Sequence, residues 1–310
     1  MFDIVGKRYW FFGLSLLVIV PGLISLALWG LPLAIDFTGG SLLEVRFEEA
    51  GAQVILPGDV NAALEGFGFG DSVVQTTGEA ADTVVIRSKT MSDETKTQVV
   101  AELSGRYGAA TILQFETVGP AVGAEVAQRA AGAVGLAALG ILLYISYAFR
   151  RVPHAIRYGT AAIIAMLHDV AVVVGTASIF GRLLGWQVDS LFLTALLTVI
   201  GFSVHDTIVV FDRIRENLVH HRRAAYEAVV NHSIVQTLDR SINTQLTVML
   251  TLLALALFGG LTIQHFVVTL LIGVFSGTYS SIFNAAPILV VWENKEWRQL
   301  VRGRRREAAA

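Results

Sequence analysis

The sequence contains no cysteine among its 310 residues, which excludes disulfide bonds and thiolate metal sites. Charged residues make up only 15% of the chain, against 54% hydrophobic residues. The H-E-x-x-H pattern of metalloproteases, the Walker motif of nucleotide hydrolysis and the G-x-S-x-G pattern of serine hydrolases are all missing. We therefore expect a protein that is not an enzyme, binds no cofactor or nucleic acid, and draws any energy from an ion gradient or a partner.

The hydrophobic residues are concentrated in six blocks, each long enough to cross a hydrocarbon core of about 30 Å as a helix. The blocks run over residues 9–31, 128–149, 156–180, 191–211, 241–258 and 266–292. Lys7 and Arg8 before the first block are typical of a signal peptide, but an apolar run of about 22 residues exceeds the usual length. No A-x-A cleavage site follows it, so we expect a retained membrane helix.

The Lys and Arg residues predict the orientation of these helices, because cytoplasmic loops carry an excess of both. The N-terminus, the two joints 150–157 and 212–240 and the C-terminal tail together hold 16 of the 23 Lys and Arg residues. Both termini are therefore expected in the cytoplasm. The predicted division is a cytoplasmic N-terminus with the first helix over 1–35, an outside domain over 36–122, membrane helices two to six over 123–292 and a basic cytoplasmic tail over 293–310.

The outside segment has the pattern of a small folded domain. Strands are expected at 41–47, 72–78, 82–89 and 110–118, with helices at 57–68 and 92–108. Ser92 is the expected cap of the second helix, in an imperfect capping box because Thr95 stands where Glu is usual. The order β-α-β-β-α-β is that of ferredoxin-like domains. No catalytic constellation stands in it, so the domain favours a role in interaction.

Two of the membrane helices carry a His-Asp pair, His168-Asp169 and His205-Asp206. An aspartate in the middle of a membrane helix costs about 2.5–3.5 kcal/mol on insertion scales, so it usually faces protein or water and has a function. Ser203 precedes Asp206 by three residues, which predicts a hydrogen bond between their side chains. A second pattern predicts a charge partner for Asp206, because Arg240 opens a polar stripe that continues on the fifth helix.

The stripe consists of Arg240, Thr244, Thr247 and Thr251, and the sixth helix has a small and polar stripe of Gly273, Gly277, Ser280, Ser281 and Asn284. A carboxyl that alternates between an ion pair with Arg240 and a neutral acid has the physical properties of a proton relay. Other interpretations stay open. Asp206 and the His168-Asp169 pair can also form static hydrogen bonds that hold helices together. Stripes of Thr and Gly more often serve helix packing than a proton pathway.

Several segments together resemble the SecD/SecF family of protein-export membrane proteins, within the resistance-nodulation-division superfamily. They are AIDFTGGSLLEVRF (34–47), FETVGPAVGAEV (115–126), MLHDVAVVVG (166–175), IGFSVHDTIVVFDRIRENL (200–218) and SIVQTLDRSINTQLTVMLTLLALALFGG (233–260). The resemblance covers nearly the whole chain. It implies six spans in the bacterial cytoplasmic membrane, a periplasmic domain, pairing with SecD, and assistance to the SecYEG channel with preprotein in transit, driven by the proton gradient.

By position, the resemblance assigns Asp206 to the family's proton path and Arg240 to its functional arginine, and Asp169 lies in an H-D-V pattern that the family shares. His205 departs from the family, which usually has Asn there, and Phe202 replaces a frequent Tyr. A titratable His205 is able to join the relay, or to act as a neutral hydrogen-bonding substitute. The proton-coupling residues we expect are Asp206, Arg240, His205 and Asp169.

Two other functions fit the same pattern. One is a small-molecule or lipid exporter of the same superfamily. It would need a larger outside domain or a second one after the third helix, and the joint at 181–190 is too short for a domain. The other is a static scaffold of the translocase, in which Asp206 is dispensable. The basic residues 220–223 and 304–306 are expected to face anionic membrane lipid.

Overall fold

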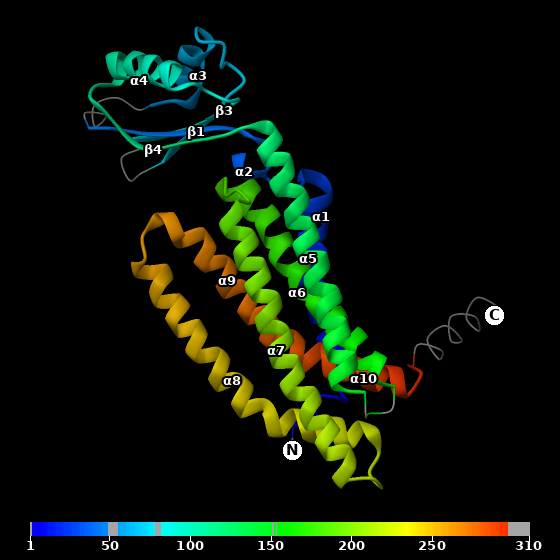
Figure 1. Cartoon of the computed structure of the whole chain (residues 1–310). Coiled ribbons are helices and arrows are strands. Elements are labelled where there is room, and N and C mark those ends of the chain that lie inside the picture. Colours follow the sequence, from blue (N-terminus) through cyan, green and yellow to red (C-terminus); the bar gives the residue numbers. More distant parts are fainter. Residues whose placement is uncertain (1, 49–54, 78–81, 151, 153, 297–310) are drawn as a thin grey trace, which may run out of the picture. The chain divides into compact units, whose positions relative to one another are not determined.

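The computed structural model describes residues 2–48, 55–77, 82–150, 152 and 154–296. They form two compact units (Figure 1): one comprises residues 1–32 and 132–310, the other residues 33–131. The predicted basic tail beyond 296 and the predicted turn between the second and third strands lie outside the described residues.

Six helices in the described part of the chain are long and apolar enough to span a membrane. The first five are α1 (Arg8–Trp29), α5 (Pro120–Ala148), α6 (Ala155–Leu184), α7 (Ser190–His220) and α8 (Tyr226–Phe258). The sixth span, Ile263–Glu293, is built from α9 (Leu261–Ser280), the π-helical turn η2 (Ser281–Ala285) and α10 (Ala286–Glu293). The prediction of six apolar spanning helices is confirmed.

One predicted helix start was wrong by a wide margin. The fifth hydrophobic block begins at residue 241, whereas α8 begins at Tyr226. The polar segment before the block is helical because Val230 and Ile234 recur at helical spacing and are buried in the same core as α7. α7 likewise continues past the apolar block to His220. Hydropathy marks the part of a helix that suits a membrane, not the whole helix.

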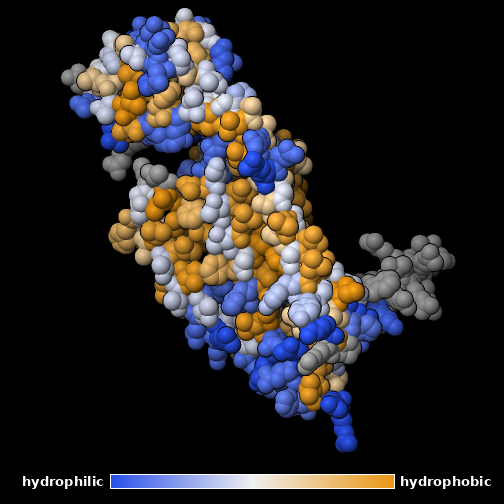
Figure 2. Space-filling view, viewed as in Figure 1, coloured by the Kyte–Doolittle hydropathy of each residue, from blue (hydrophilic) through white to orange (hydrophobic). Residues whose placement is uncertain are grey.

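The spanning helices differ greatly in how far the chain buries them. In the most hydrophobic 18-residue window of each helix, 50% of residues are buried in α7 and 56% in the last span, but only 6% in α5 and 11% in α8. Orange hydrophobic residues cover the middle of the helical unit in Figure 2. In a membrane this surface contacts lipid or a partner protein.

At one end of the helical unit, Arg8 joins the first helix to two other parts of the chain. Its guanidinium forms ion pairs with Glu227 at 2.8 Å and with Glu296 at 2.6 Å. Burial alone would raise the pKa of Glu296, but hydrogen bonds from Arg8 and Tyr9 hold that pKa below its usual range. The side chain of Asn231 adds a second link, because it accepts from the backbone N–H groups of residues 4 and 5.

The second unit is an antiparallel sheet covered by two helices. Its elements are β1 (Gly40–Phe47), α3 (Pro57–Glu65), β2 (Val73–Thr77), β3 (Thr83–Ser88), α4 (Asp93–Tyr107) and β4 (Ala110–Val118), preceded by the short helix α2 (Ile35–Thr38). The strands lie in the order β2-β3-β1-β4, each antiparallel to its neighbours. Both helices lie on the same side of the sheet in Figure 1 and enclose a buried apolar core.

Two local predictions for this unit are confirmed. The element order is the one expected, and the Ser92 hydroxyl caps α4 by accepting from the backbone N–H of Thr95 at 3.2 Å. The backbone conformation explains why residues 39 and 40 are both glycine. Both residues have positive φ, 73° and 122°, and a Cβ on Gly40 would collide with the Ser88 carbonyl of the neighbouring strand.

Candidate functional site in the membrane helices

Asp206 lies on α7 and its side chain is buried between α7 and α8. The Ser241 hydroxyl on α8 donates to its Oδ1 at 2.7 Å. Its Oδ2 is also buried but has no hydrogen-bond partner among the described residues. One turn further along α8, the buried Oε1 of Gln245 is likewise without a partner. Buried polar atoms are nearly always satisfied, so these two mark an incomplete or changeable site.

Neither predicted partner of Asp206 contacts it in this chain. Ser203 hydrogen-bonds a different carboxyl, and Arg240 is exposed and forms no ion pair with any described residue. Helix geometry explains the second difference. Residue 241, not 240, lies on the side of α8 that faces α7, because neighbouring residues on a helix point about 100° apart. His205 is exposed as well, next to the buried Asp206.

Asp169 on α6 is the most fully bonded carboxyl in the described part of the membrane helices. It is 0% exposed and accepts from three serine hydroxyls: Ser203 at 2.5 Å, Ser276 at 2.7 Å and Ser280 at 2.7 Å. The Nδ1 of His168 lies 3.0 Å from its Oδ1. These contacts join α6, α7 and α9 at one point, an arrangement suited to fixing three helices.

The small and polar stripe of the last span packs against α7. A Cβ on Gly277 would lie 3.2 Å from the Ser203 Cβ, and one on Gly273 would collide with Val199. Beyond the glycines, the Ser281 hydroxyl shares a hydrogen bond with Thr207 Oγ1 at 3.0 Å. The stripe thus brings backbones close together and places hydroxyls beside both aspartates.

The polar stripe of α8 faces away from the rest of the chain. Its members Arg240, Thr244, Thr247 and Thr251 are all exposed. Thr247 and Thr251 direct their hydroxyls to carbonyls of their own helix, at 2.8 and 3.0 Å. Such a row, with a guanidinium at one end, is unfavourable against hydrocarbon. It indicates a surface that a protein partner or water covers.

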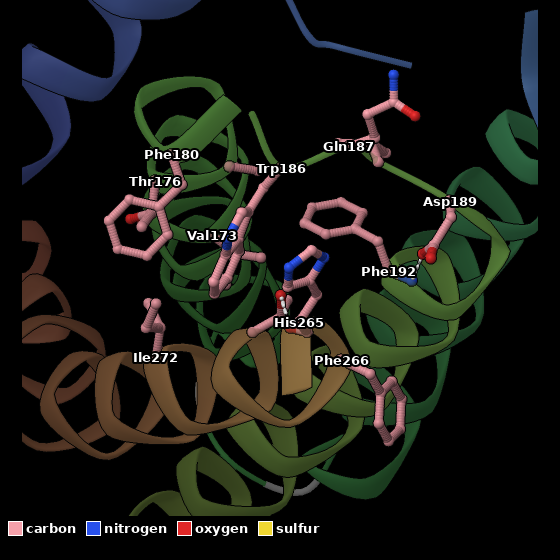
Figure 3. A pocket seen from close by; sticks show the side chains of 13 residues that line it. Val173, Thr176, Phe180, Trp186, Gln187, Asp189, Phe192, His265, Phe266 and Ile272 are labelled. Atoms are coloured by element: carbon pink, nitrogen blue, oxygen red, sulfur yellow. Dashed lines mark hydrogen bonds between the residues drawn. The ribbon is translucent and has the colours of Figure 1, made fainter. Parts of the chain in front are cut away.

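A small, partly open pocket lies where α6, α7 and α9 meet the 185–189 loop (Figure 3). His265 stacks on Trp186 with ring centroids 4.1 Å apart, and Asp189 Oδ1 accepts from the backbone N–H of Phe192. The cavity has about 20 Å³ of room, enough for about one water. No cluster of three metal-ligating side chains occurs in the described residues. Sequence reasoning did not identify this cavity.

The serine donors were only partly recognisable from sequence. Ser280 and Ser281 stand in the predicted stripe, but Ser241 and Ser276 carried no signal. A serine in an apolar helix is common, and only the packing of the helices selects the carboxyl that it meets. The hydrophobic pattern identified the helices, and the pairing of side chains across them needed the structure.

Comparison with known proteins gives a consistent result. Residues 98–295 match the family model of the protein export membrane protein SecD/SecF C-terminal region, and residues 24–50 match the SecD/SecF GG motif. The chain is 56% identical over 300 residues to the protein translocase subunit SecF of Anaerolinea thermophila, covering 96% of both chains. It is 51% identical to that of Thermobaculum terrenum over the full length of both.

Two larger proteins contain a related part. The chain is 36% identical to the translocase subunit SecDF of Bacillus subtilis, covering 96% of this chain and 39% of that one. It is also similar to the crystal structure of SecDF, a translocon-associated membrane protein from Thermus thermophilus, with a TM-score of 0.82 and 34% identity. That match covers 94% of this chain, which spans 39% of the longer protein.

Proposed function

The chain belongs to the SecD/SecF family of protein-export membrane proteins, and we propose that it uses the proton-motive force, together with SecD, to promote preprotein translocation. Its relatives are named as subunits of a protein translocase, a transport role rather than catalysis. In the proposal, the SecF-type chain and SecD assist the SecYEG channel, and the energy comes from protons that cross the membrane through the helical unit.

The observation that carries this proposal is the state of Asp206. A buried carboxyl with one donor and one unpartnered oxygen suits a proton carrier, because its neutral and ionised forms need different numbers of hydrogen bonds. Asp169 differs, since three hydroxyls and an imidazole surround it. We assign the primary proton-carrying role to Asp206 and give Asp169 a supporting place in the same path.

The exposed polar residues on α7 and α8 support the proposal that a partner protein covers this part of the helical unit. His205 adjoins Asp206 in the chain, and Arg240 adjoins Ser241, so the two exposed side chains flank the buried Asp206–Ser241 hydrogen bond. We propose that SecD covers this face and that Arg240 is enclosed in the complex, where it takes part in proton coupling. Relatives in which SecD and SecF form one chain agree with such an interface.

The proposed orientation follows the charge distribution. The two termini and the joints rich in Lys and Arg lie in the cytoplasm, and the 36–122 domain lies in the periplasm. The strand order β2-β3-β1-β4 supports a ferredoxin-like assignment for that domain. We propose that it contacts preprotein or a partner as the protonation state of the membrane helices changes.

The experiment is preprotein export into membrane vesicles that contain the cognate SecD and SecYEG, with and without a proton gradient. Asp206→Asn is expected to remove most of the gradient-dependent component while the complex still assembles. Asp239→Asn is the matched control, since Asp239 is an exposed carboxylate on α8 two residues from Ser241. Export by Asp206→Asn that retains the whole gradient-dependent component, in a normally assembled complex, contradicts the proposal and favours a static scaffold.

A further inference from the structure

The last membrane span contains a π-helical turn beside the candidate proton carrier. This turn, η2, covers Ser281–Ala285 and is followed by Pro287 in α10. A proline inside a helix has no N–H to donate and its ring crowds the carbonyl four residues earlier. That carbonyl belongs to Phe283, in the middle of η2, so Pro287 accounts for the local change of helix type. Single π-helical turns occur frequently at functional sites.

Ser281 is the first residue of this turn and is 0% exposed. Its hydroxyl reaches two carbonyl oxygens, those of Gly277 at 2.8 Å and Ser203 at 3.2 Å. It also lies 3.0 Å from Thr207 Oγ1. A serine hydroxyl has one hydrogen to donate, so these acceptors are alternatives reached by rotation of one bond. Ser281 therefore has a choice of acceptors within a buried site.

The position of Ser281 places it next to Asp206. Two of its neighbours on α7, Ser203 and Thr207, are three residues before and one residue after the aspartate. Ser281 therefore faces the stretch of α7 that contains the aspartate. The carboxyl has a buried oxygen, Oδ2, with no partner, and its other oxygen already accepts from Ser241. Ser281 thus brings a hydroxyl from a third element, η2, next to the α7 residues that flank the aspartate.

We propose that Ser281 is a switchable positioning residue for Asp206: its hydroxyl donates to a backbone carbonyl while the carboxyl is neutral, and turns to Oδ2 when the carboxyl loses its proton. In this proposal, the π-helical turn sets the hydroxyl beside α7, so that rotation of one side-chain bond exchanges the carbonyl for Oδ2. The serine keeps its own proton throughout. The only covalent bond broken is the O–H bond of the carboxyl: its electron pair stays on Oδ2, and its proton passes to water on the side of the membrane to which the proposed proton path opens.

The inference deepens the proposed function and rests on Asp206 as the proton carrier. An ionised carboxylate in a dry site needs more donors than a neutral acid does. Ser241 supplies one donor at all times, whereas Ser281 supplies a second only when charge appears. Such a donor stabilises the ionised state without fixing the site in that state.

Other titratable groups belong to the elements packed around this site. They are His205 and Asp212 on α7, Asp239 and Arg240 on α8, His168 and Asp169 on α6 and Tyr279 on α9. All of them are retained in the variants used below, so a difference between two variants at Ser281 reports the hydroxyl.

The test measures the protonation of Asp206 directly rather than transport. A hydrophobic carbodiimide modifies protonated carboxyls, and mass spectrometry gives the fraction of Asp206 modified at each pH in vesicles that contain the chain with SecD. In Ser281→Ala the midpoint of modification is expected to move to higher pH by about one unit, since the ionised form loses one hydrogen bond to a charged group. Ser281→Thr, which retains the hydroxyl, is expected to keep the wild-type midpoint.

Two controls separate switching from packing. Ser281→Cys keeps the size of the side chain but is only a weak donor, so its midpoint is expected to follow Ser281→Ala, and it serves if the alanine variant does not fold. Thr278→Ala removes a hydroxyl that bonds its own helix at the Val274 carbonyl, and its midpoint is expected to stay unchanged. A midpoint in Ser281→Ala or Ser281→Cys that equals the wild-type value overturns the inference.

This readout also separates the two proposals. If Asp206→Asn retains full gradient-dependent export, the proposed function is contradicted, and the inference about Ser281 is overturned with it. Loss of that export with an unchanged midpoint in the Ser281 variants overturns only the inference. Loss of that export with a raised midpoint, restored by Ser281→Thr, supports both.

Discussion

Ser203 and Asp169 form a hydrogen bond of 2.5 Å between α7 and α6, although Ser203 lies three residues from Asp206 on its own helix. The contact divides the polar residues of the membrane helices into two groups. Asp169 accepts hydrogen bonds from serines of α7 and α9, whereas Asp206 accepts a single hydrogen bond, from a serine of α8. Two aspartates with the same His-Asp sequence context thus have opposite surroundings, one saturated and one incomplete.

The Asp169 cluster is expected to be a stability centre of the helical unit. Asp169→Leu leaves the buried hydroxyls of Ser203 and Ser276 without an acceptor, at a cost of about 1–3 kcal/mol each, whereas Ser280 still reaches the Gly277 carbonyl. We expect a loss on the order of 3 kcal/mol or more, read as a lower unfolding temperature of the purified complex in detergent. Ser276→Ala is expected to lose about 1–3 kcal/mol, since the other donors remain. Wild-type stability in Asp169→Leu contradicts the cluster's structural role.

The Ser241 hydroxyl is expected to matter for activity more than for assembly. Ser241→Ala leaves both oxygens of Asp206 without the donor seen in the structure, at a cost of about 1–3 kcal/mol for the buried polar group. Gradient-dependent export is expected to fall severalfold while the complex with SecD is still recovered. Thr278→Ala, which removes a hydroxyl that bonds only its own helix at the Val274 carbonyl, is the control for loss of a hydroxyl. If the two variants export preprotein equally well, Ser241 has no part in the proton-carrying site.

A close glycine contact between α1 and α6 gives a packing prediction. A Cβ on Gly175 would lie 2.7 Å from the Cα of Gly22, and the nearest atoms all belong to the backbone of Gly22 rather than to a side chain that can turn aside. Gly175→Ala is expected to destabilise the protein by about 1–3 kcal/mol through overpacking. Gly201→Ala, whose Cβ meets nothing within 4 Å, is expected to be neutral or to gain up to about 1 kcal/mol of helix propensity. Thermal unfolding of the two variants side by side checks the difference.

The ion pair between Arg8 and Glu296 predicts a pH dependence of stability. The folded-state pKa of Glu296 lies below its unfolded value, so its contribution is fully present above the unfolded pKa and is lost as pH falls through the folded pKa. Stability is expected to decline below about pH 4.5, the region where Glu titrates. Glu296→Gln is expected to flatten this part of the profile, whereas Glu102→Gln, at an exposed pair on α4, leaves it unchanged. The check is thermal unfolding measured across that pH range.

Much of the fold followed from local patterns. The six apolar blocks, the β-α-β-β-α-β order and the Ser92 cap were all predicted from spacing alone, because hydropathy, alternation and caps act over a few residues. The start of α8 was not, since its first turns owe their burial to Val230 and Ile234, which pack in the core shared with α7. The π-helical turn was not predicted either, although Pro287 was visible in the sequence.

The sequence by itself determined which ionisable residues stand in the apolar helices: Asp169, His205, Asp206 and Arg240 were all recognised, because an ionisable group in an apolar helix is conspicuous. Only the tertiary structure decided what each of them meets. The assignment of Ser203 to Asp169, of Ser241 to Asp206 and of Arg240 to the outer face depends on how the helices are rotated against one another. That rotation is set by close packing at glycines such as Gly277, over the whole length of the helices, and no single helix specifies it.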